Sequence, residues 1–195
     1  HEFDGLLLGN FGSWQLVNEL AGERPIHTDW SFNVFNSWAA ELLATLGASL
    51  ITASLELQLS QIRRICQEVS VPVSIVAHGP LESMVTKHCI FRDQGCRYQC
   101  QTQAPLQLRD NKGFCFPAYF DRWCNMHIFN SRELSLLQHI GQVKQSGIRY
   151  LRIEGRTKEP SWIRTVVELY RRGLAGEQVE MQWEFTKGHY FRGVL

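Results

Sequence analysis

The residues of this chain that are best suited to chemistry are its cysteines. Five of the six fall in one short stretch, namely Cys89, Cys96, Cys100, Cys115 and Cys124. Three residues separate Cys96 from Cys100, and Cys89 and Cys124 flank that pair. Four thiolates meet the ligand demand of an iron–sulfur cluster or of a structural zinc. Crowding of this kind without a secretion signal favours metal over disulfides.

The spacing of the cysteines does not choose between the two metals. Zinc ribbons usually show two Cys-x-x-Cys pairs, and this chain has none. Cys115 lies between Phe114 and Phe116, an apolar setting that indicates packing rather than ligation. Cys66 is remote from the cluster in sequence and is expected in the core. Unligated buried cysteines are the structural alternative to a metal site.

A second set of polar residues follows the predicted strands. Working residues of parallel β/α folds lie at the C-terminal ends of strands, and these ends carry His27, Asp29, Glu56, His78, Gly79, Glu154 and Arg156. We expect one shared pocket with five catalytic candidates, His27, Asp29, His78, Glu154 and Arg156. Arg156 would bind a carboxylate or phosphate through two hydrogen bonds. The alternatives are hydrogen-bonded core histidines and a structural ion pair between Glu154 and Arg156.

Alternating strands and helices must position these groups. Short apolar runs predict strands over 5–9, 25–29, 50–54, 73–77 and 150–154. Helical periodicity predicts helices over 13–20, 36–46, 60–69, 132–145 and 161–172. Ser13 is the expected N-cap of the first helix, and Gly47 and Gly147 are expected just past the second and fourth. Strands separated by single helices form parallel βαβ units.

The fold class that follows is α/β, with a partial, truncated β/α barrel of the TIM type. Five strands are too few for a closed eight-stranded barrel, so we expect an upstream half of the same barrel before His1. An open doubly wound sheet is the competing architecture, although no Gly-x-Gly-x-x-Gly follows any strand. The expected organisation is a barrel half over 1–79, a Cys-rich insert over 80–130 with turn residues at 109–113, and final β/α units over 131–195.

Composition and charge narrow the classes of function. The 195 residues are 44% hydrophobic with a net charge of +1. No apolar run reaches the roughly 18 residues that a membrane span needs, so we expect a cytoplasmic protein without a membrane partner. Residues 1–86 hold three of the 20 Lys and Arg and nine of the 19 Asp and Glu. The basic remainder can attract phosphate, or its charges are spread over solvated helix faces.

Several segments resemble a known family in sequence and in order. The run from His78 to Cys89, His-Gly-Pro-Leu-Glu-Ser-Met-Val-Thr-Lys-His-Cys, resembles a motif of the collagenase-like peptidase family U-32. The family's Asn-rich turn and its Lys-Ile-Glu-Gly-Arg motif are similar to 29–37 and 152–156. The segments 130–137 and 185–193 also fit, so the resemblance spans most of the chain.

The resemblance implies a bacterial protein that is part of an enzyme. The family is catalogued as peptidases, while other relatives are iron–sulfur proteins that support oxygen-independent hydroxylation of ribosomal RNA, transfer RNA or ubiquinone precursors, with prephenate as the oxygen donor. Their four-iron four-sulfur cluster is held by four cysteines, which correspond by position to Cys89, Cys96, Cys100 and Cys124. Some relatives have a cysteine where this chain has Glu82. The fourth ligand, Cys124 or Cys115, therefore stays open.

Two other functions remain as alternatives. A collagenase-like protease would need a thiolate beside a base that a third group orients. His88 adjoins Cys89, but neighbours in sequence rarely point at one another productively, and the chain has no Gly-x-Ser-x-Gly or His-Glu-x-x-His. A segment that only binds RNA or another partner, without catalysis, is the third possibility.

Overall fold

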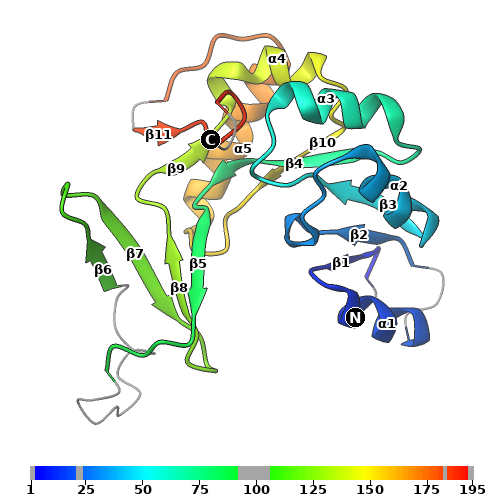
Figure 1. The fold of residues 1–195 in the computed structure, drawn as a ribbon. Coiled ribbons are helices and arrows are strands. Elements are labelled where there is room, and N and C mark those ends of the chain that lie inside the picture. Colours follow the sequence, from blue (N-terminus) through cyan, green and yellow to red (C-terminus); the bar gives the residue numbers. More distant parts are fainter. Residues whose placement is uncertain (1–2, 21–23, 92–105, 182–183, 193–195) are drawn as a thin grey trace. The chain divides into compact units, whose positions relative to one another are not determined.

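The computed structural model describes residues 3–20, 24–91, 106–181 and 184–192. The chain forms two units (Figure 1). The first unit comprises His1–His78, Ser135–Gln182 and Lys187–Leu195. The second comprises Gly79–Leu134 and Trp183–Thr186, a range that contains most of the cysteines.

Five parallel strands build the first unit. They are β1 (Leu6–Leu8), β2 (Ile26–Thr28), β3 (Ala48–Thr52), β4 (Val73–Gly79) and β10 (Tyr150–Ile153). Each pairs in parallel with the next in this order. All seven residues of β4 are buried, as expected for a parallel strand covered on both faces. The prediction of an α/β fold with five parallel strands is confirmed, although the same sheet also holds β9 (Glu133–Ser135) and β11 (Phe185–Thr186), which were not predicted.

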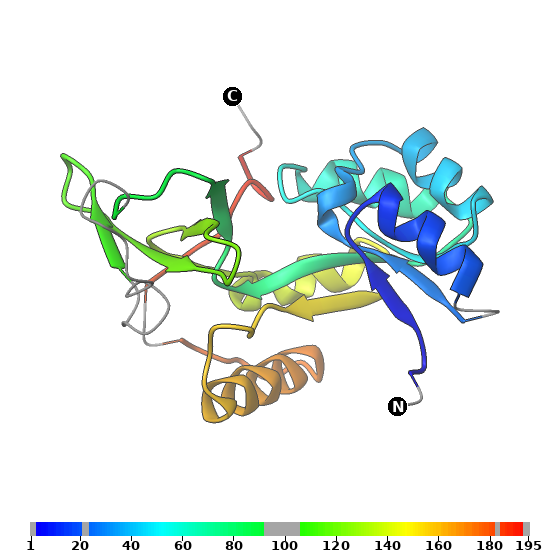
Figure 2. The same cartoon turned by 90° about the horizontal axis from the view of Figure 1, so that it is seen from below.

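Helices follow the strands and cover them. They are α1 (Phe11–Leu20), α2 (Ser37–Thr45), α3 (Leu59–Glu68), α4 (Ile140–Gln145) and α5 (Pro160–Leu174). Helix α1 contacts β1, α2 contacts β3, and α5 contacts β10, which can be followed in Figure 2. Asn36 caps α2 by accepting the Ala39 N–H at 2.8 Å. Gly47 ends this helix with a φ of +106°, as predicted.

Two predictions about helices are wrong. The first helix begins at Phe11, and Asn10 rather than Ser13 caps it, because Asn10 Oδ1 accepts the Ser13 N–H at 2.8 Å. Residues 132–145 are not one helix. They form β9 (Glu133–Ser135), a 3-10 turn and then α4. Pairing of β9 with β11 (Phe185–Thr186), distant in sequence, overrides the local helical periodicity.

An antiparallel sheet builds the second unit. Its strand order is β5 (Glu82–Thr86), β8 (Met126–Phe129), β7 (Cys115–Phe120) and β6 (Leu106–Arg109). The predicted turn after Arg109 joins β6 to β7, with Asp110 accepting from Lys112 and Phe114 and with Gly113 at a φ of +87°. The strands themselves were not predicted.

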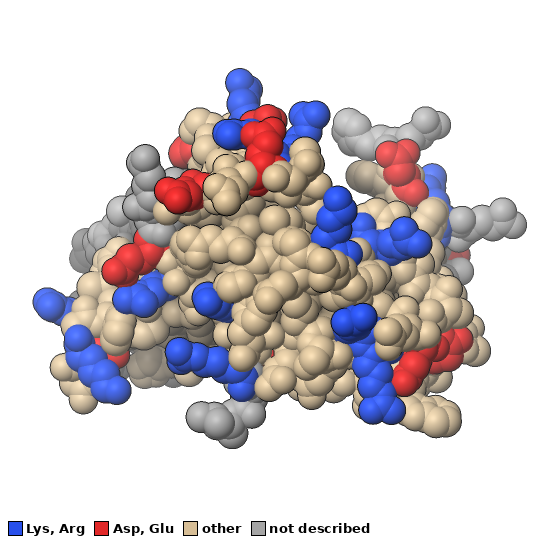
Figure 3. All heavy atoms as spheres, turned by 90° about the horizontal axis from the view of Figure 1, so that it is seen from above, with Lys and Arg blue, Asp and Glu red and all other residues tan. Residues whose placement is uncertain are grey.

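The surface of the described residues carries mixed charge. Figure 3 shows Lys and Arg side chains scattered among acidic and uncharged residues on one face. No helix within the described ranges is both long and apolar enough to cross a membrane.

Candidate functional site

Charged side chains meet at the ends of β2 and β10 in the first unit. Asp29 follows β2, and Glu154 follows β10. Arg152 bridges them, because its Nη1 donates to Asp29 Oδ1 and its Nη2 donates to Glu154 Oε2 at 2.8 Å. Arg156 Nε donates to the other Glu154 oxygen at 2.6 Å. Three predicted site residues, Asp29, Glu154 and Arg156, are thus joined in one network.

Arg152 is the member of this network that sequence reasoning did not select. It lies two residues before Glu154, and residues two apart in a strand point to the same face. This spacing of two residues from Glu154 could have identified Arg152 from the sequence. On a flat sheet, β2 and β10 would lie three strand spacings apart, about 14 Å. The ion pair with Asp29 spans these three spacings through the long Arg152 side chain, and a sheet that curves toward this face would shorten that distance.

The network joins opposite charges on side chains that are mostly shielded from solvent, except that of Arg156. The side chains of Asp29, Arg152 and Glu154 are 18%, 20% and 10% exposed, whereas that of Arg156 is 69% exposed. Burial opposes ionisation of Glu154, but hydrogen bonds and charges from Arg156 and Arg152 outweigh it and lower the pKa. Glu154 therefore stays ionised and holds the Arg156 guanidinium at the surface.

His78 lies in a different environment. Its side chain is fully buried, and its ring lies 5.4 Å from that of Trp162 and 5.5 Å from that of Tyr170. Among the described residues, neither ring nitrogen has a hydrogen-bond partner. Burial and then the charge of Lys158 lower the His78 pKa to about 4. The histidine is neutral near pH 7 and is enclosed by aromatic rings.

The remaining strand-end candidates stay outside the charged network. His27 is half-buried in β2, and Glu56 is exposed beyond β3. Among the residues that the structure describes, no hydrogen bond joins His27, Glu56 or His78 to the network around Arg152.

In the second unit, the segments that carry Cys89 and Cys124 leave the sheet at the same end. Thr86, the last residue of β5, pairs with Met126, the first residue of β8. Cys89 follows Thr86 by three residues, and Cys124 precedes Met126 by two. Antiparallel pairing therefore brings the backbone at both cysteines to one edge of the unit.

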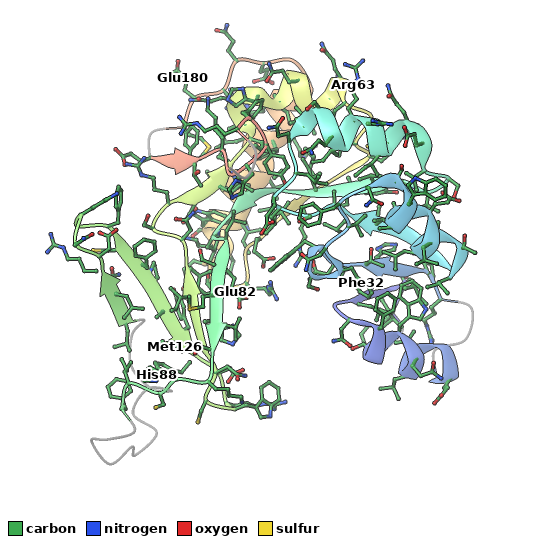
Figure 4. All side chains as sticks on the ribbon, viewed as in Figure 1. Phe32, Arg63, Glu82, His88, Met126 and Glu180 are labelled. Carbon is green, nitrogen blue, oxygen red and sulfur yellow. The ribbon has the colours of Figure 1, made fainter. Side chains whose placement is uncertain are left out.

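Side-chain contacts join these two segments. Figure 4 labels His88 and Met126 at this end of the sheet and Glu82 nearer the other. Lys87 Nζ donates to the Trp123 carbonyl oxygen at 3.2 Å. The segment after β5 and the turn before β8 are thus held together.

The chain between Cys89 and β6 also starts and finishes at this end. The Phe91 ring contacts that of Phe120, the last residue of β7, with 5.9 Å between centroids. Leu106 begins β6 and pairs with Ala118, two residues before the end of β7. The other two predicted ligands, Cys96 and Cys100, fall between Phe91 and Leu106 and lie outside the described residues.

A turn built by Asp121 presents Cys124. Asp121 Oδ1 accepts the N–H groups of Trp123 and Asn125 at 2.9 and 2.8 Å, and Oδ2 accepts the Asn125 side chain at 2.6 Å. Cys124 adopts a left-handed φ of +59°, and its N–H bonds to the Asp121 carbonyl. This conformation is uncommon for a residue other than glycine, so the hydrogen bonds of Asp121 must stabilise it.

His127 links the same turn to β5. Its Nδ1 lies 2.9 Å from Glu82 Oε1, and its Nε2 lies 3.3 Å from Asp121 Oδ2. Burial lowers the His127 pKa, but hydrogen bonds to Glu82 and then Asp121 outweigh it and raise the pKa. For Asp121, burial is outweighed by hydrogen bonds from Asn125, His127 and Trp123, which lower its pKa. Glu82 thus anchors the turn that carries Cys124.

The remaining cysteines differ from this pair. Cys115 is exposed at the start of β7 and pairs with Arg109. Cys66 lies half-buried in α3 of the first unit, and burial raises its pKa to about 11. Considering only the described ranges, which omit Cys96 and Cys100, no three His, Cys, Asp or Glu residues are grouped as a metal site.

Comparison with known proteins gives distant relatives. A tRNA hydroxylation protein P of Helicobacter pylori is 25% identical over 182 residues, covering 87% of this chain and 43% of the relative. A 23S rRNA 5-hydroxycytidine synthase of Escherichia coli is 24% identical over 158 residues, covering 76% of this chain and 23% of the relative. A collagenase of Porphyromonas gingivalis is 20% identical over 210 residues, covering 94% of this chain and 49% of the relative.

The chain spans less than half the length of these relatives. No solved structure matches it significantly. The model of peptidase family U32 matches residues 1–186, nearly the whole chain, and the protein therefore belongs to peptidase family U32.

Proposed function

We propose that this chain is part of an iron–sulfur protein that supports oxygen-independent hydroxylation of RNA, with a four-iron four-sulfur cluster held by Cys89, Cys96, Cys100 and Cys124. The observation that carries the proposal is that the segments with Cys89 and Cys124 leave the β5–β8 pair at the same end. The segment with the other two cysteines is anchored at that same end through Phe91 and Leu106. Two thiolates at one end of the sheet, with two more on the chain between Phe91 and Leu106, match the number of donors that such a cluster needs.

The strand register favours Cys124 over Cys115 as the fourth ligand. Cys115 begins β7, and Phe120 ends it beside Met126. Five residues of extended chain separate the two ends by about 16 Å. Cys115 therefore lies at the far end of β7 from Cys89 and Cys124, which supports Cys124 as the fourth ligand.

RNA is the substrate class that the relatives support. Two of them are named for hydroxylation of tRNA or synthesis of 5-hydroxycytidine in rRNA. A quinone precursor is the other hydroxylation substrate that we consider. When bound, the cluster supplies one-electron chemistry, while the chain's own residues bind and orient the reactants.

The network of Asp29, Arg152, Glu154 and Arg156 is our candidate for the anion site of a small carboxylate donor. The hydrogen bond from Arg156 Nε to Glu154 fixes the orientation of the guanidinium, and the Arg156 side chain remains largely exposed. A guanidinium held in this way suits a carboxylate geometrically. Arg156→Lys is expected to weaken binding of that anion, and unchanged affinity would exclude the assignment.

We also propose that the first unit is half of a β/α barrel. The ion pair between Arg152 and Asp29 supports a sheet that curves as a barrel wall does, and the relatives are more than twice as long as the part matched. Further strands of such a barrel would pair with β1, which is at the edge of the described sheet and whose Leu7 is 52% exposed.

A collagenase-like protease is the alternative that the Porphyromonas relative favours. A cysteine protease needs a thiolate bonded to a base. In the described part of the chain, Cys115 Sγ bonds to the Gly113 carbonyl, and His127 bonds to two carboxylates rather than to a thiol. Hydrolysis of gelatin that is lost in Cys89→Ser would favour this alternative.

The experiment that tests the proposal uses single Cys→Ser variants, purified and reconstituted without oxygen. Replacing any of Cys89, Cys96, Cys100 or Cys124 should abolish bound iron and sulfide and the visible absorption of the cluster. Cys115→Ser and Cys66→Ser are the matched controls and should retain both. Loss of the cluster in Cys115→Ser with retention in Cys124→Ser would contradict the ligand set.

A further inference from the structure

We propose that Trp123, with Arg122 and Lys87, forms a stacking and phosphate-binding site for single-stranded RNA beside the thiolates. The proposal rests on the proposed function and names the surface that would hold its substrate. It is carried by one exposed aromatic ring, its fixed backbone and the charges around it.

Trp123 presents its ring to solvent from a fixed backbone. The side chain is 62% exposed. Its N–H donates to Asp121 Oδ1 at 2.9 Å, and its carbonyl accepts from Lys87 Nζ at 3.2 Å. A large apolar ring on a rigid turn loses little conformational entropy when a ligand covers it. Such a ring is a platform for a planar partner.

The charges around the ring are basic. The Arg122 guanidinium carbon lies over one face of the Trp123 ring, 4.2 Å from its centroid, so a base would stack on the opposite face. Lys87 has three donors, of which one bonds to the Trp123 carbonyl. Asp121, two residues from Trp123, is 23% exposed and bonds to His127, as does Glu82, which lies toward the other end of β5 and is 20% exposed. The surface therefore offers cationic groups to an anionic chain.

An aromatic face with flanking cations is how proteins bind unpaired nucleotides. Bases stack on the ring, while Lys and Arg neutralise the phosphates. A base paired in a duplex keeps its faces covered, so the site favours a loop or single strand. Trp123 adjoins Cys124, and Lys87 is two residues from Cys89. A nucleotide bound here would lie next to the proposed cluster.

The test measures binding of a labelled single-stranded RNA of about 12 nucleotides, within the site sizes of single-strand-binding folds, to the whole chain by fluorescence anisotropy. Trp123→Ala should weaken binding by about 5-fold to 150-fold, the range expected for loss of one base stack. Trp123→Phe keeps a ring and should recover most of the affinity. Trp38, which is 85% exposed on α2, gives the matched control, and Trp38→Ala should bind as the wild type.

Charge-neutral variants test the phosphate contacts. Arg122→Gln and Lys87→Gln should each reduce the dependence of log affinity on log salt by about 0.7. Heparin, a polyanion without bases, should bind Trp123→Ala and the wild type equally.

Four results would overturn the inference. Equal RNA affinity of Trp123→Ala and wild type would remove Trp123 from the site and leave the proposed function intact. If Trp123→Ala lost as much affinity for heparin as for RNA, the surface would bind polyanions through charge alone. If it lost as much affinity for a duplex, the surface would fit a partner other than single-stranded RNA. A wild-type chain that binds no single-stranded RNA would instead overturn the RNA function itself.

Discussion

Replacing Arg152 with Met tests whether the charged network stabilises the first unit. The substitution keeps an apolar stem but leaves Asp29 and Glu154 without their shared cation, and both side chains are less than one-fifth exposed. Removing one partner of a largely buried ion pair costs about 3–5 kcal/mol, a large share of the roughly 5–15 kcal/mol that holds a domain folded.

The assay is urea unfolding followed by tryptophan fluorescence, with the free energy of unfolding obtained by linear extrapolation. Arg171→Met is the matched control, because the Arg171 side chain is 77% exposed and lies 3.7 Å from the Glu168 carboxylate. An exposed pair of this kind contributes about 0–1 kcal/mol. Equal losses in the two variants would refute the assignment of a stabilising network.

The pH dependence of the stability that Arg152→Met loses gives a second check. Arg156 and Arg152 outweigh the burial of Glu154 and lower its pKa. The stability that this carboxylate contributes is present above its ordinary pKa and is lost as pH falls through the lowered value. The difference between wild type and Arg152→Met should therefore narrow in acid, and a constant difference would contradict this explanation.

Three further predictions follow from buried or bridging groups. The His78 pKa of about 4 means that wild-type stability is full above about pH 6.5 and falls by about 3 kcal/mol toward pH 4; His78→Phe should abolish that loss in unfolding measurements at both pH values. The raised His127 pKa stabilises the second unit below about pH 6.5 and less as pH rises through the raised value, so His127→Gln should flatten the pH profile of its thermal unfolding. Asp121→Ala should lower iron bound per chain, whereas Asp110→Ala, which removes a similar turn aspartate after β6, should not; equal iron in both variants would argue against a positioning role.

The sequence predicted those parts of the fold whose signals are local. Strands β1, β2, β3 and β10 lie within two residues of their predicted bounds, because each is a short apolar run between turn residues. The antiparallel sheet was missed for the opposite reason. Met84 and Val85 of β5 are more than half exposed, and β7 contains Pro117, a residue that usually argues against a strand.

The sequence predicted at which end of the sheet the candidate site lies, but it did not predict toward which face the side chains point. The strand-end rule selected Asp29, Glu154 and Arg156, which the structure joins. It also selected His78, whose ring packs against Trp162 and Tyr170 instead. Successive residues of a strand point to opposite faces, and the sequence alone does not say which face is the concave one.

The register of the second unit lay beyond sequence reasoning for a related reason. That Cys124 lies opposite the segment of Cys89, and Cys115 does not, depends on which residues of β5, β7 and β8 pair. Pairing between segments that are far apart in the sequence produces no periodic pattern in the residues between them. The crowding of cysteines predicted a site, and the strand register shows that Cys89 and Cys124 are carried at one end of the sheet and Cys115 at the other.

The central claim is most directly tested by iron and acid-labile sulfide analysis of the wild-type chain purified without oxygen. The proposed ligand set predicts about four irons and four sulfides per chain, with a visible absorption that disappears in Cys89→Ser and in Cys124→Ser. One tightly bound zinc per chain without sulfide, or a full cluster that survives both substitutions, would contradict it.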